Sequence, residues 1–142
     1  MSTATRRHCA IYTDGGARGN PGPAAAGGVI IADDGSIVAE MSEYLGITTN
    51  NVAEYRALIM ALQRAIGAGF REVDICIDSE LIVKQLRGEY RVKDVKMIPL
   101  HQRVRSLLSH FQAATISHVG REQNKHADKL VNAALDAQAD TP

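Results

Sequence analysis

Two aspartates each follow a short apolar run with the character of a β-strand. Asp14 comes after the run at 11–13 and enters a segment rich in Gly, Asn and Pro, and Asp78 ends the run at 73–78. Strand alternation places Asp14 on the same face as Tyr12. We therefore expect both carboxylates to be held at strand ends. For Asp14 taken alone, the alternative is a structural turn that the carboxylate caps.

Two further carboxylates fall within the apolar arcs of predicted helices. At about 100° per residue, Glu54 lies about 40° from Leu58, and Asp128 lies about 20° from Leu135. A carboxylate on that face points into the protein, where burial is costly unless it meets a cation, a metal ion or water. For Glu54, a buried ion pair with an arginine is the alternative to a functional site.

The order strand, helix, strand links the two aspartates. A crossover helix at 52–68 joins the first strand to the strand at 73–78, so these strands are expected to be parallel neighbours. Asp14 and Asp78 then lie at one edge of the sheet, with Glu54 leaning over them. Close carboxylates raise one another's pKa values unless a cation neutralises them. An all-oxygen cluster suits Mg²⁺ or Mn²⁺ better than zinc, and predicts metal-assisted phosphoryl chemistry.

The remaining elements complete an α/β pattern. Further strands are predicted at 27–32, 37–41 and 114–119, with a turn at 33–36 that makes the first three strands an antiparallel meander. Helices are also predicted at 80–87, 99–111 and 124–137, and residues 136–142 are expected to fray. We expect one domain over residues 1–142, ordered from about 8 to 137.

Composition limits the classes of protein to which the chain can belong. Its 142 residues are 45% hydrophobic and 23% charged, and no apolar run reaches the length of a membrane span. The polar start MSTATRRH does not resemble a secretory signal, so a cytoplasmic protein, monomeric and without membrane contacts, is expected. The two cysteines predict free thiols. Sixteen basic and sixteen acidic residues cancel, so any nucleic-acid binding must come from local clusters.

Four sequence blocks resemble the signature blocks of type I ribonuclease H. In chain order they read TDGGARGNPGPAAAGG at 13–28, TTNNVAEYRAL at 48–58, IDSELIVKQL at 77–86 and HVGREQNKHADKLVNAAL at 118–135. The resemblance covers about residues 10–135, and each block carries one of the four acids. It implies an α/β protein of ribonuclease H-like fold, with a five-stranded mixed sheet flanked by helices.

The resemblance also implies a function. It indicates a metal-dependent endonuclease that hydrolyses the RNA strand of RNA–DNA hybrids to 5′-phosphate and 3′-hydroxyl ends, and some members of this branch also cut double-stranded RNA. Two Mg²⁺ ions, replaceable by Mn²⁺, would be held by Asp14, Glu54, Asp78 and Asp128. The positions that match family contacts to the backbone and sugars of the hybrid are Gly15, Asn20, Asn50, Asn51 and Ser79.

The loop before the last acid departs from well-studied bacterial relatives, which carry a histidine there. The candidates are His118, Arg121 and His126, and the R-E-x-N-x-x-A-D pattern resembles an archaeal and actinobacterial-like branch with arginine at the first position. Arg121 is therefore preferred, while His118 is better explained as an ordinary residue at a strand end. Because arginine does not exchange protons near neutral pH, it would assist by its charge.

The region that is a long basic protrusion in many relatives is short here and contains no tryptophan. Its cations are Lys84, Arg87, Arg91, Lys93 and Lys96. Contacts with phosphates and a merely solvated loop both fit this composition. Since some members of the branch are fused to a second catalytic domain, the chain ending at Pro142 fits either a complete protein or a fragment.

Two other functions were weighed against the endonuclease. A catalytically weak nucleic-acid-binding module of the same fold is disfavoured because all four acids are present. A dinucleotide-binding loop at GGARGNPG is disfavoured because the glycines are spaced G-x-x-G-x-x-G and a strand, not a helix, is predicted to follow.

Overall fold

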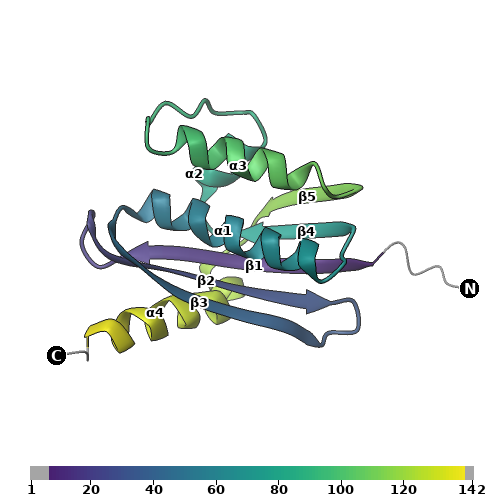
Figure 1. Cartoon of the computed structure of the whole chain (residues 1–142), viewed down its shortest axis with the longest axis horizontal. Helices are drawn as coiled ribbons and strands as arrows, with labels where there is room; N and C mark the ends of the chain where they lie inside the picture. Colours follow the sequence, from purple (N-terminus) through teal and green to yellow (C-terminus); the bar gives the residue numbers. More distant parts are fainter. Residues whose placement is uncertain (1–6, 140–142) are drawn as a thin grey trace, which may run out of the picture.

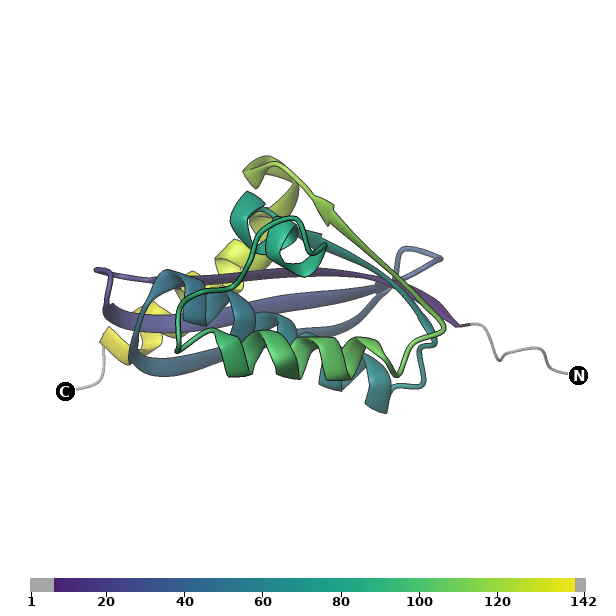
Figure 2. The ribbon, with the colours of Figure 1, turned by 90° about the horizontal axis from the view of Figure 1, so that it is seen from above.

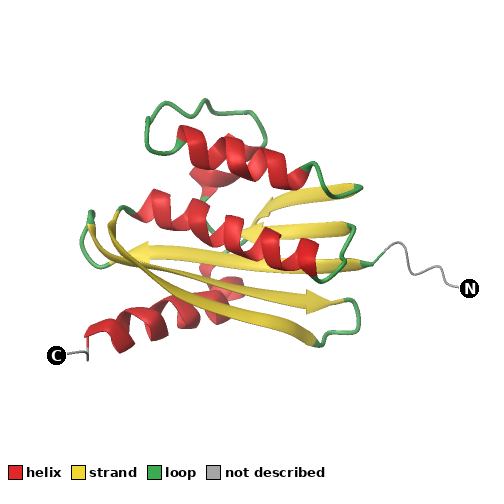
Figure 3. Cartoon of the chain, viewed as in Figure 1, coloured by secondary structure: helices red, strands yellow, loops and turns green. Residues whose placement is uncertain are grey.

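The computed structural model describes residues 7–139, which contain five strands and four α-helices (Figures 1 and 3). The elements are β1 His8–Ala17, β2 Gly22–Ala32, β3 Ile37–Thr48, α1 Asn50–Gly67, β4 Glu72–Ile77, α2 Glu80–Leu86, α3 Ile98–Leu108, β5 Ala113–His118, the 3₁₀ turn η2 Arg121–Asn124 and α4 Lys125–Ala139. Residues 1–6 and 140–142, which the sequence predicts as parts of short tails, lie outside the described residues.

The strands form one mixed sheet in the order β3-β2-β1-β4-β5. β1 and β2, and β2 and β3, pair antiparallel, whereas β4 pairs parallel with both β1 and β5. The parallel pairing of β1 and β4 follows from the crossover through α1. The fold class predicted from the sequence, a five-stranded mixed sheet flanked by helices, is confirmed.

The glycine-rich segment after Asp14 is strand rather than loop, so the prediction that the first strand ends at Asp14 is wrong. β1 runs on to Ala17 and β2 already begins at Gly22, which confines the turn to residues 18–21. The small residues serve close packing of helices on the sheet. A Cβ atom on Gly15 would lie 2.2 Å from the carbonyl carbon of Ala53 in α1, and one on Gly27 would lie 2.6 Å from the carbonyl oxygen of Ala127 in α4.

The helices cover the sheet on both faces. In Figure 1, α1 lies in front of the strands and α4 behind them, and α3 runs alongside α1 in Figures 1 and 2. The main hydrophobic core lies between the sheet and α1, α2 and α3, whereas a small cluster of Ala25, Val131 and Leu135 seats α4 on the other face. None of the helices in the described residues is long and apolar enough to cross a membrane.

Other boundaries also differ from the sequence prediction, and α3 ends at Leu108 rather than at residue 111. β3 continues to Thr48, well past the predicted end at 41, because its residues keep pairing with the extended β2 as far as Gly22. α4 continues to Ala139, so residues 136–139 are helical rather than frayed. Asp136 is held there by an ion pair with Arg18, at 2.6 Å between Nη2 and Oδ1.

Candidate metal centre

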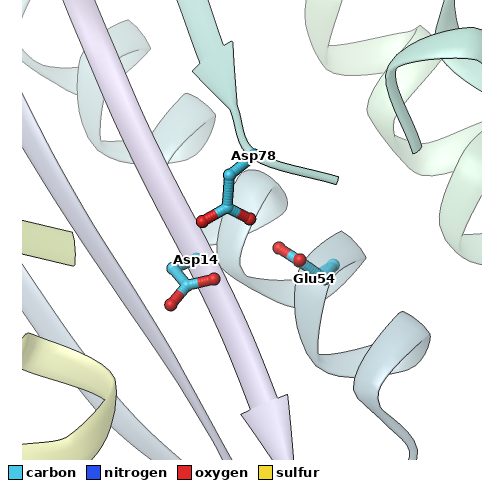
Figure 4. A group of neighbouring side chains, drawn as sticks. All are labelled: Asp14, Glu54 and Asp78. Atoms are coloured by element: carbon cyan, nitrogen blue, oxygen red, sulfur yellow. The ribbon is translucent and has the colours of Figure 1, made fainter. Parts of the chain in front are cut away.

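Three carboxylates converge at one edge of the sheet. Asp14 from β1, Glu54 from α1 and Asp78, directly after β4, each offer an oxygen atom within 4.8 Å of the other two (Figure 4). Asp14 and Glu54 are buried, each with 9% of its surface exposed, and Asp78 is half-buried. These three residues were expected to meet, and they do.

Strand register and a close helix contact bring the three side chains together. Thr13 pairs with Ile77, so Asp14 and Asp78 each follow the last pair of the parallel β1–β4 ladder. Glu54 is brought against β1 by the approach of α1 to Gly15, whose backbone N–H donates to Glu54 Oε1 at 3.2 Å. The missing side chain at Gly15 is therefore what lets Glu54 reach the aspartates.

The cluster is electrostatically unfavourable without a cation. Burial, followed by the charge of Asp78 and by Asp128, raises the pKa of Asp14 to about 8. Burial, followed by the charges of Asp14 and Asp78, also holds the pKa of Glu54 well above its usual range, although the Gly15 N–H and the charge of Arg121 oppose the shift. An all-oxygen donor set with this excess of negative charge suits a hard divalent cation. The site is thus compatible with divalent metal binding.

Asp128 is not one of the three converging carboxylates, but it lines the same cleft beside Asp14. It is exposed on the first turn of α4, so the prediction that it points inward is wrong. The buried positions of α4 are Ala127, Val131 and Leu135, and each step of four residues turns the buried stripe by about 40°. Asp128 points in nearly the same direction as Leu135, which lies two helical turns further on. It does not point in the direction of Ala127, the buried residue in its own turn. Its carboxylate nevertheless lies close enough to Asp14 to raise the pKa of that group.

A cleft of about 630 Å³ opens over the carboxylates. Among the predicted substrate contacts, Gly15, Asn50 and Ser79 line it, whereas Asn20 and Asn51 do not. Asn20 accepts a hydrogen bond from the Asn50 backbone N–H at 3.0 Å, and the Asn50 side-chain oxygen accepts one from the Ala17 N–H at 2.7 Å. The two asparagines therefore tie the β1–β2 turn to the start of α1.

Arg121 lines the cleft, and the two competing histidines do not. Arg121 is exposed at the start of η2, and its charge lowers the pKa of Glu54. His118 lies at the end of β5, with its ring nitrogen 3.3 Å from the backbone carbonyl oxygen of Asp78. His126 pairs with Glu40 on β3. Geometry thus favours Arg121 among the three candidates.

Three residues at the site were not singled out from the sequence. Arg18 and Lys125 line the cleft and add positive charge to its walls. Asn124 is buried beneath it and contacts Asp78. Arg18 lies within the block GGARGNPG and Asn124 within R-E-x-N-x-x-A-D, so both motifs held the signal. Nothing in the sequence shows which side of an element faces the cleft.

The short basic region from Lys84 in α2 to Lys96 before α3 lies outside this cleft. None of its five cations lines the cleft, and two of them make contacts within the chain. Lys84 lies 3.5 Å from Glu80 and over the ring of Tyr90, while the Arg87 guanidinium donates to the Ile116 carbonyl oxygen at 2.7 and 3.0 Å. Arg87 therefore has a structural role, joining α2 to β5.

Comparison with known proteins gives a consistent result. The profile of a family described as reverse transcriptase-like matches residues 12–134. A ribonuclease HI from Halobacterium salinarum is 47% identical over 125 residues, which are 88% of this chain and 63% of that protein. The crystal structure of RNase H1 from the same archaeon has a TM-score of 0.89 at 45% identity, covering 92% of this chain and 98% of that chain. LC11-RNase H1, crystallised in complex with an RNA/DNA hybrid, has a TM-score of 0.88 at 43% identity, covering 92% of this chain and 99% of that one.

The strand order and the carboxylate cluster define a protein of ribonuclease H-like fold with an acidic, metal-compatible site. The profile match and these relatives identify it further: the chain belongs to the ribonuclease H family. The resemblance drawn from the four sequence blocks is thereby confirmed. The chain spans 63% of the length of the Halobacterium ribonuclease HI that it matches.

Proposed function

We propose that this chain is a metal-dependent endonuclease that hydrolyses the RNA strand of RNA–DNA hybrids, leaving 5′-phosphate and 3′-hydroxyl ends. The observation that carries the proposal is the convergence of Asp14, Glu54 and Asp78 within 4.8 Å at the base of an open cleft. The similarity to a ribonuclease HI and to an RNase H1 crystallised with an RNA/DNA hybrid supports this choice of substrate.

The four carboxylates are proposed to hold two Mg²⁺ ions, with Mn²⁺ as a substitute. Asp14, Glu54 and Asp78 offer the inner oxygen atoms, and Asp128 lies next to Asp14 at the open side of the cleft. When bound, the metal ions supply a water of lowered pKa and stabilise the leaving 3′-oxygen. The chain holds its carboxylates ready for them through the Gly15 N–H bond to Glu54.

The walls of the cleft carry the residues that would bind the hybrid. Arg18, Arg121 and Lys125 line the cleft around the acids, together with Glu122, and Arg18 also pairs with Asp136. These three cations would contact phosphates of the hybrid backbone. We propose that Arg121 assists the reaction by its charge. The contacts proposed for Gly15, Asn20, Asn50, Asn51 and Ser79 would reach the backbone and sugars, and a contact to a 2′-hydroxyl would select the RNA strand.

Several finer properties belong to the same proposal. Activity on double-stranded RNA, a monomeric state, a cytoplasmic location and a single domain over residues 1–142 were expected from the sequence. They remain predictions, of which substrate preference and oligomeric state are the most direct to measure.

The test is cleavage of end-labelled RNA–DNA, RNA–RNA and DNA–DNA duplexes with Mg²⁺, Mn²⁺ or chelator. We expect metal-dependent cutting of the RNA strand in the hybrid. Asp14→Asn should reduce cleavage by at least about a hundredfold while hybrid binding stays within a fewfold, because the carboxylate contacts metal rather than the duplex. Full activity of Asp14→Asn would overturn the assignment of the site.

The second candidate function is a module of the same fold that binds nucleic acid without cutting it. Binding of the hybrid by the wild-type chain, with no cleavage of any duplex in either metal, would favour this module. The observation in its favour is that Asp128 is exposed and is not one of the three converging carboxylates. If Asp128 bound the second metal ion weakly, the site would cut slowly.

A further inference from the structure

A buried asparagine joins the carboxylate cluster to the last helix. Asn124 is the last residue of η2, immediately before α4, and only 1% of its surface is exposed. Its side-chain amide nitrogen lies 2.9 Å from the Thr13 carbonyl oxygen and 3.2 Å from Asp78 Oδ2. The two N–H groups of one amide thus reach β1, one residue before Asp14, and the carboxylate that follows β4.

These two hydrogen bonds restrict how Asp78 can turn. Asp78 directly follows the last residue of β4, and the Asn124 side chain donates to its carboxylate. The hydrogen bond from Asn124 engages Oδ2, and the carboxylate keeps further lone pairs that can bind a cation. A neutral amide provides this orientation without a positive charge, which would compete with a metal ion for the carboxylate.

The side-chain oxygen of Asn124 indicates that this residue does more than fill space in the core. Asn124 Oδ1 is buried and has no hydrogen-bond partner among residues 7–139, and neither does the nearby Thr13 Oγ1. A buried polar atom without a partner is destabilising by comparison with an apolar side chain of the same shape. The orphaned oxygen therefore offsets part of the stability that the two hydrogen bonds of the amide nitrogen provide, and one of those bonds is made to Asp78.

We propose that Asn124 is a positioning residue that orients the Asp78 carboxylate for divalent metal binding and couples the start of α4 to that carboxylate. The inference rests on the proposed function, because it takes Asp78 to be a metal ligand. Asn124 would not touch the hybrid, since it lies beneath the cleft rather than on its lining.

The test is Asn124→Leu, which keeps the size of the side chain and removes both N–H donors. Mn²⁺ binding without nucleic acid is measured by calorimetry and by the electron paramagnetic resonance signal of free Mn²⁺. We expect the variant to stay folded in chelator, with a melting temperature at or below that of the wild type because two hydrogen bonds are lost. It should bind Mn²⁺ at least about tenfold more weakly. In cleavage at saturating metal, the KM for the hybrid should change less than threefold.

Gln85→Leu is the matched control. Gln85 is also a buried amide, 5% exposed, and its side-chain oxygen accepts a hydrogen bond from the Tyr55 hydroxyl at 2.7 Å, but it does not line the cleft. Its Mn²⁺ affinity should stay within twofold of wild type. Wild-type affinity in folded Asn124→Leu would overturn the inference and leave the proposed function intact, whereas absence of Mn²⁺ binding by the wild-type chain would overturn the proposed function.

A measurement on the unmodified chain covers the case in which Asn124→Leu does not fold. In ¹⁵N-labelled wild-type protein, the Asn124 side-chain amide resonances should shift during a Mg²⁺ titration with the same midpoint as metal binding. The side-chain amide of Gln85 should not shift. Asn124 resonances that stay unmoved through saturation would contradict the inference.

Discussion

The chemistry of the site begins with carboxylates that the fold holds against their mutual repulsion. Asp14 and Glu54 are each 9% exposed and face Asp78 from two different elements. Their raised pKa values mean that the folded state disfavours their ionised forms. Without a cation, the ionised carboxylates of such a site lower the stability of the folded state. A bound divalent cation would remove their repulsion.

The pH dependence of stability should therefore change with metal. An acid whose folded-state pKa is raised binds its proton more tightly when folded, so stability falls as pH rises from its ordinary pKa of 3.8 to about 8 for Asp14. In chelator, we expect the free energy of unfolding, measured by urea denaturation, to fall across this interval. Saturating Mg²⁺ or Mn²⁺ should flatten the decline.

The control for this measurement is Asp14→Asn, which removes one of the coupled charges. Its decline in chelator should be shallower than that of the wild type, and its stability at pH 8 in chelator should be at least as high. Superimposable wild-type profiles with and without metal would contradict the electrostatic account.

At the scale of elements, two helices reach the sheet at positions that have no side chain. α1 crosses β1 at Gly15, and α4 crosses β2 at Gly27. These contacts set the distance between each helix and the strands. They therefore also set how closely Glu54 on α1 and Asp128 on α4 approach the other carboxylates. Gly15 and Gly27 thus help to position the carboxylates, although they contribute no side chain to the site.

Gly15→Ala should separate α1 from β1. The added Cβ would lie 2.2 Å from the Ala53 carbonyl carbon and 2.4 Å from the Glu54 nitrogen, both backbone atoms. We expect a loss of about 3 kcal/mol or more in the free energy of unfolding, and weaker Mn²⁺ binding in any folded fraction. Denaturant unfolding and calorimetry provide the two measurements.

Gly67→Ala is the matched control for that substitution. Gly67 ends the same helix, and a Cβ there would meet nothing within 4 Å. Its effect on stability should stay within about 1 kcal/mol and should favour the variant, because alanine restricts the unfolded chain. A Gly15→Ala protein as stable as Gly67→Ala would show that α1 does not rest on Gly15.

At the scale of the whole molecule, a second charged cluster ties the sheet together at the other end of β1. The two ring nitrogens of His8 contact Asp33, in the β2–β3 turn, and Asp74 of β4, and the Thr115 hydroxyl of β5 donates to Asp74 at 2.6 Å. The hydrogen bond to Asp33 is the main cause that raises the pKa of His8, while burial opposes it. The cluster thus connects β1, the β2–β3 turn, β4 and β5.

The contribution of His8 to stability should depend on pH with a defined sign. A histidine whose folded-state pKa is raised stabilises the fold fully below its unfolded pKa of 6.5, and loses that contribution as pH rises through the raised value. His8→Gln should therefore lower the melting temperature more at pH 5.5 than at pH 8.5. An equal loss for His8→Gln at both pH values would contradict the role of the charge.

The sequence by itself determined the antiparallel meander of the first three strands, the parallel pairing of the first and fourth through α1, and the meeting of Asp14, Glu54 and Asp78. These follow from local periodicity and from the handedness of a strand–helix–strand unit, both of which are written along the chain. The four motif blocks added the family, and the comparisons bear it out.

Only the tertiary structure decided the extent of β1 and β2, the exposure of Asp128 and the place of Asn124 beneath Asp78. Glycines within a strand look like a loop until the helices that press on them are in place. A helical wheel also gives only the direction of a side chain around the helix axis and not its position along that axis. It therefore cannot tell which residue of α4 meets the sheet. Such contacts join residues as far apart as 13 and 124, and the packing of helices on the sheet, rather than any local pattern, selects them.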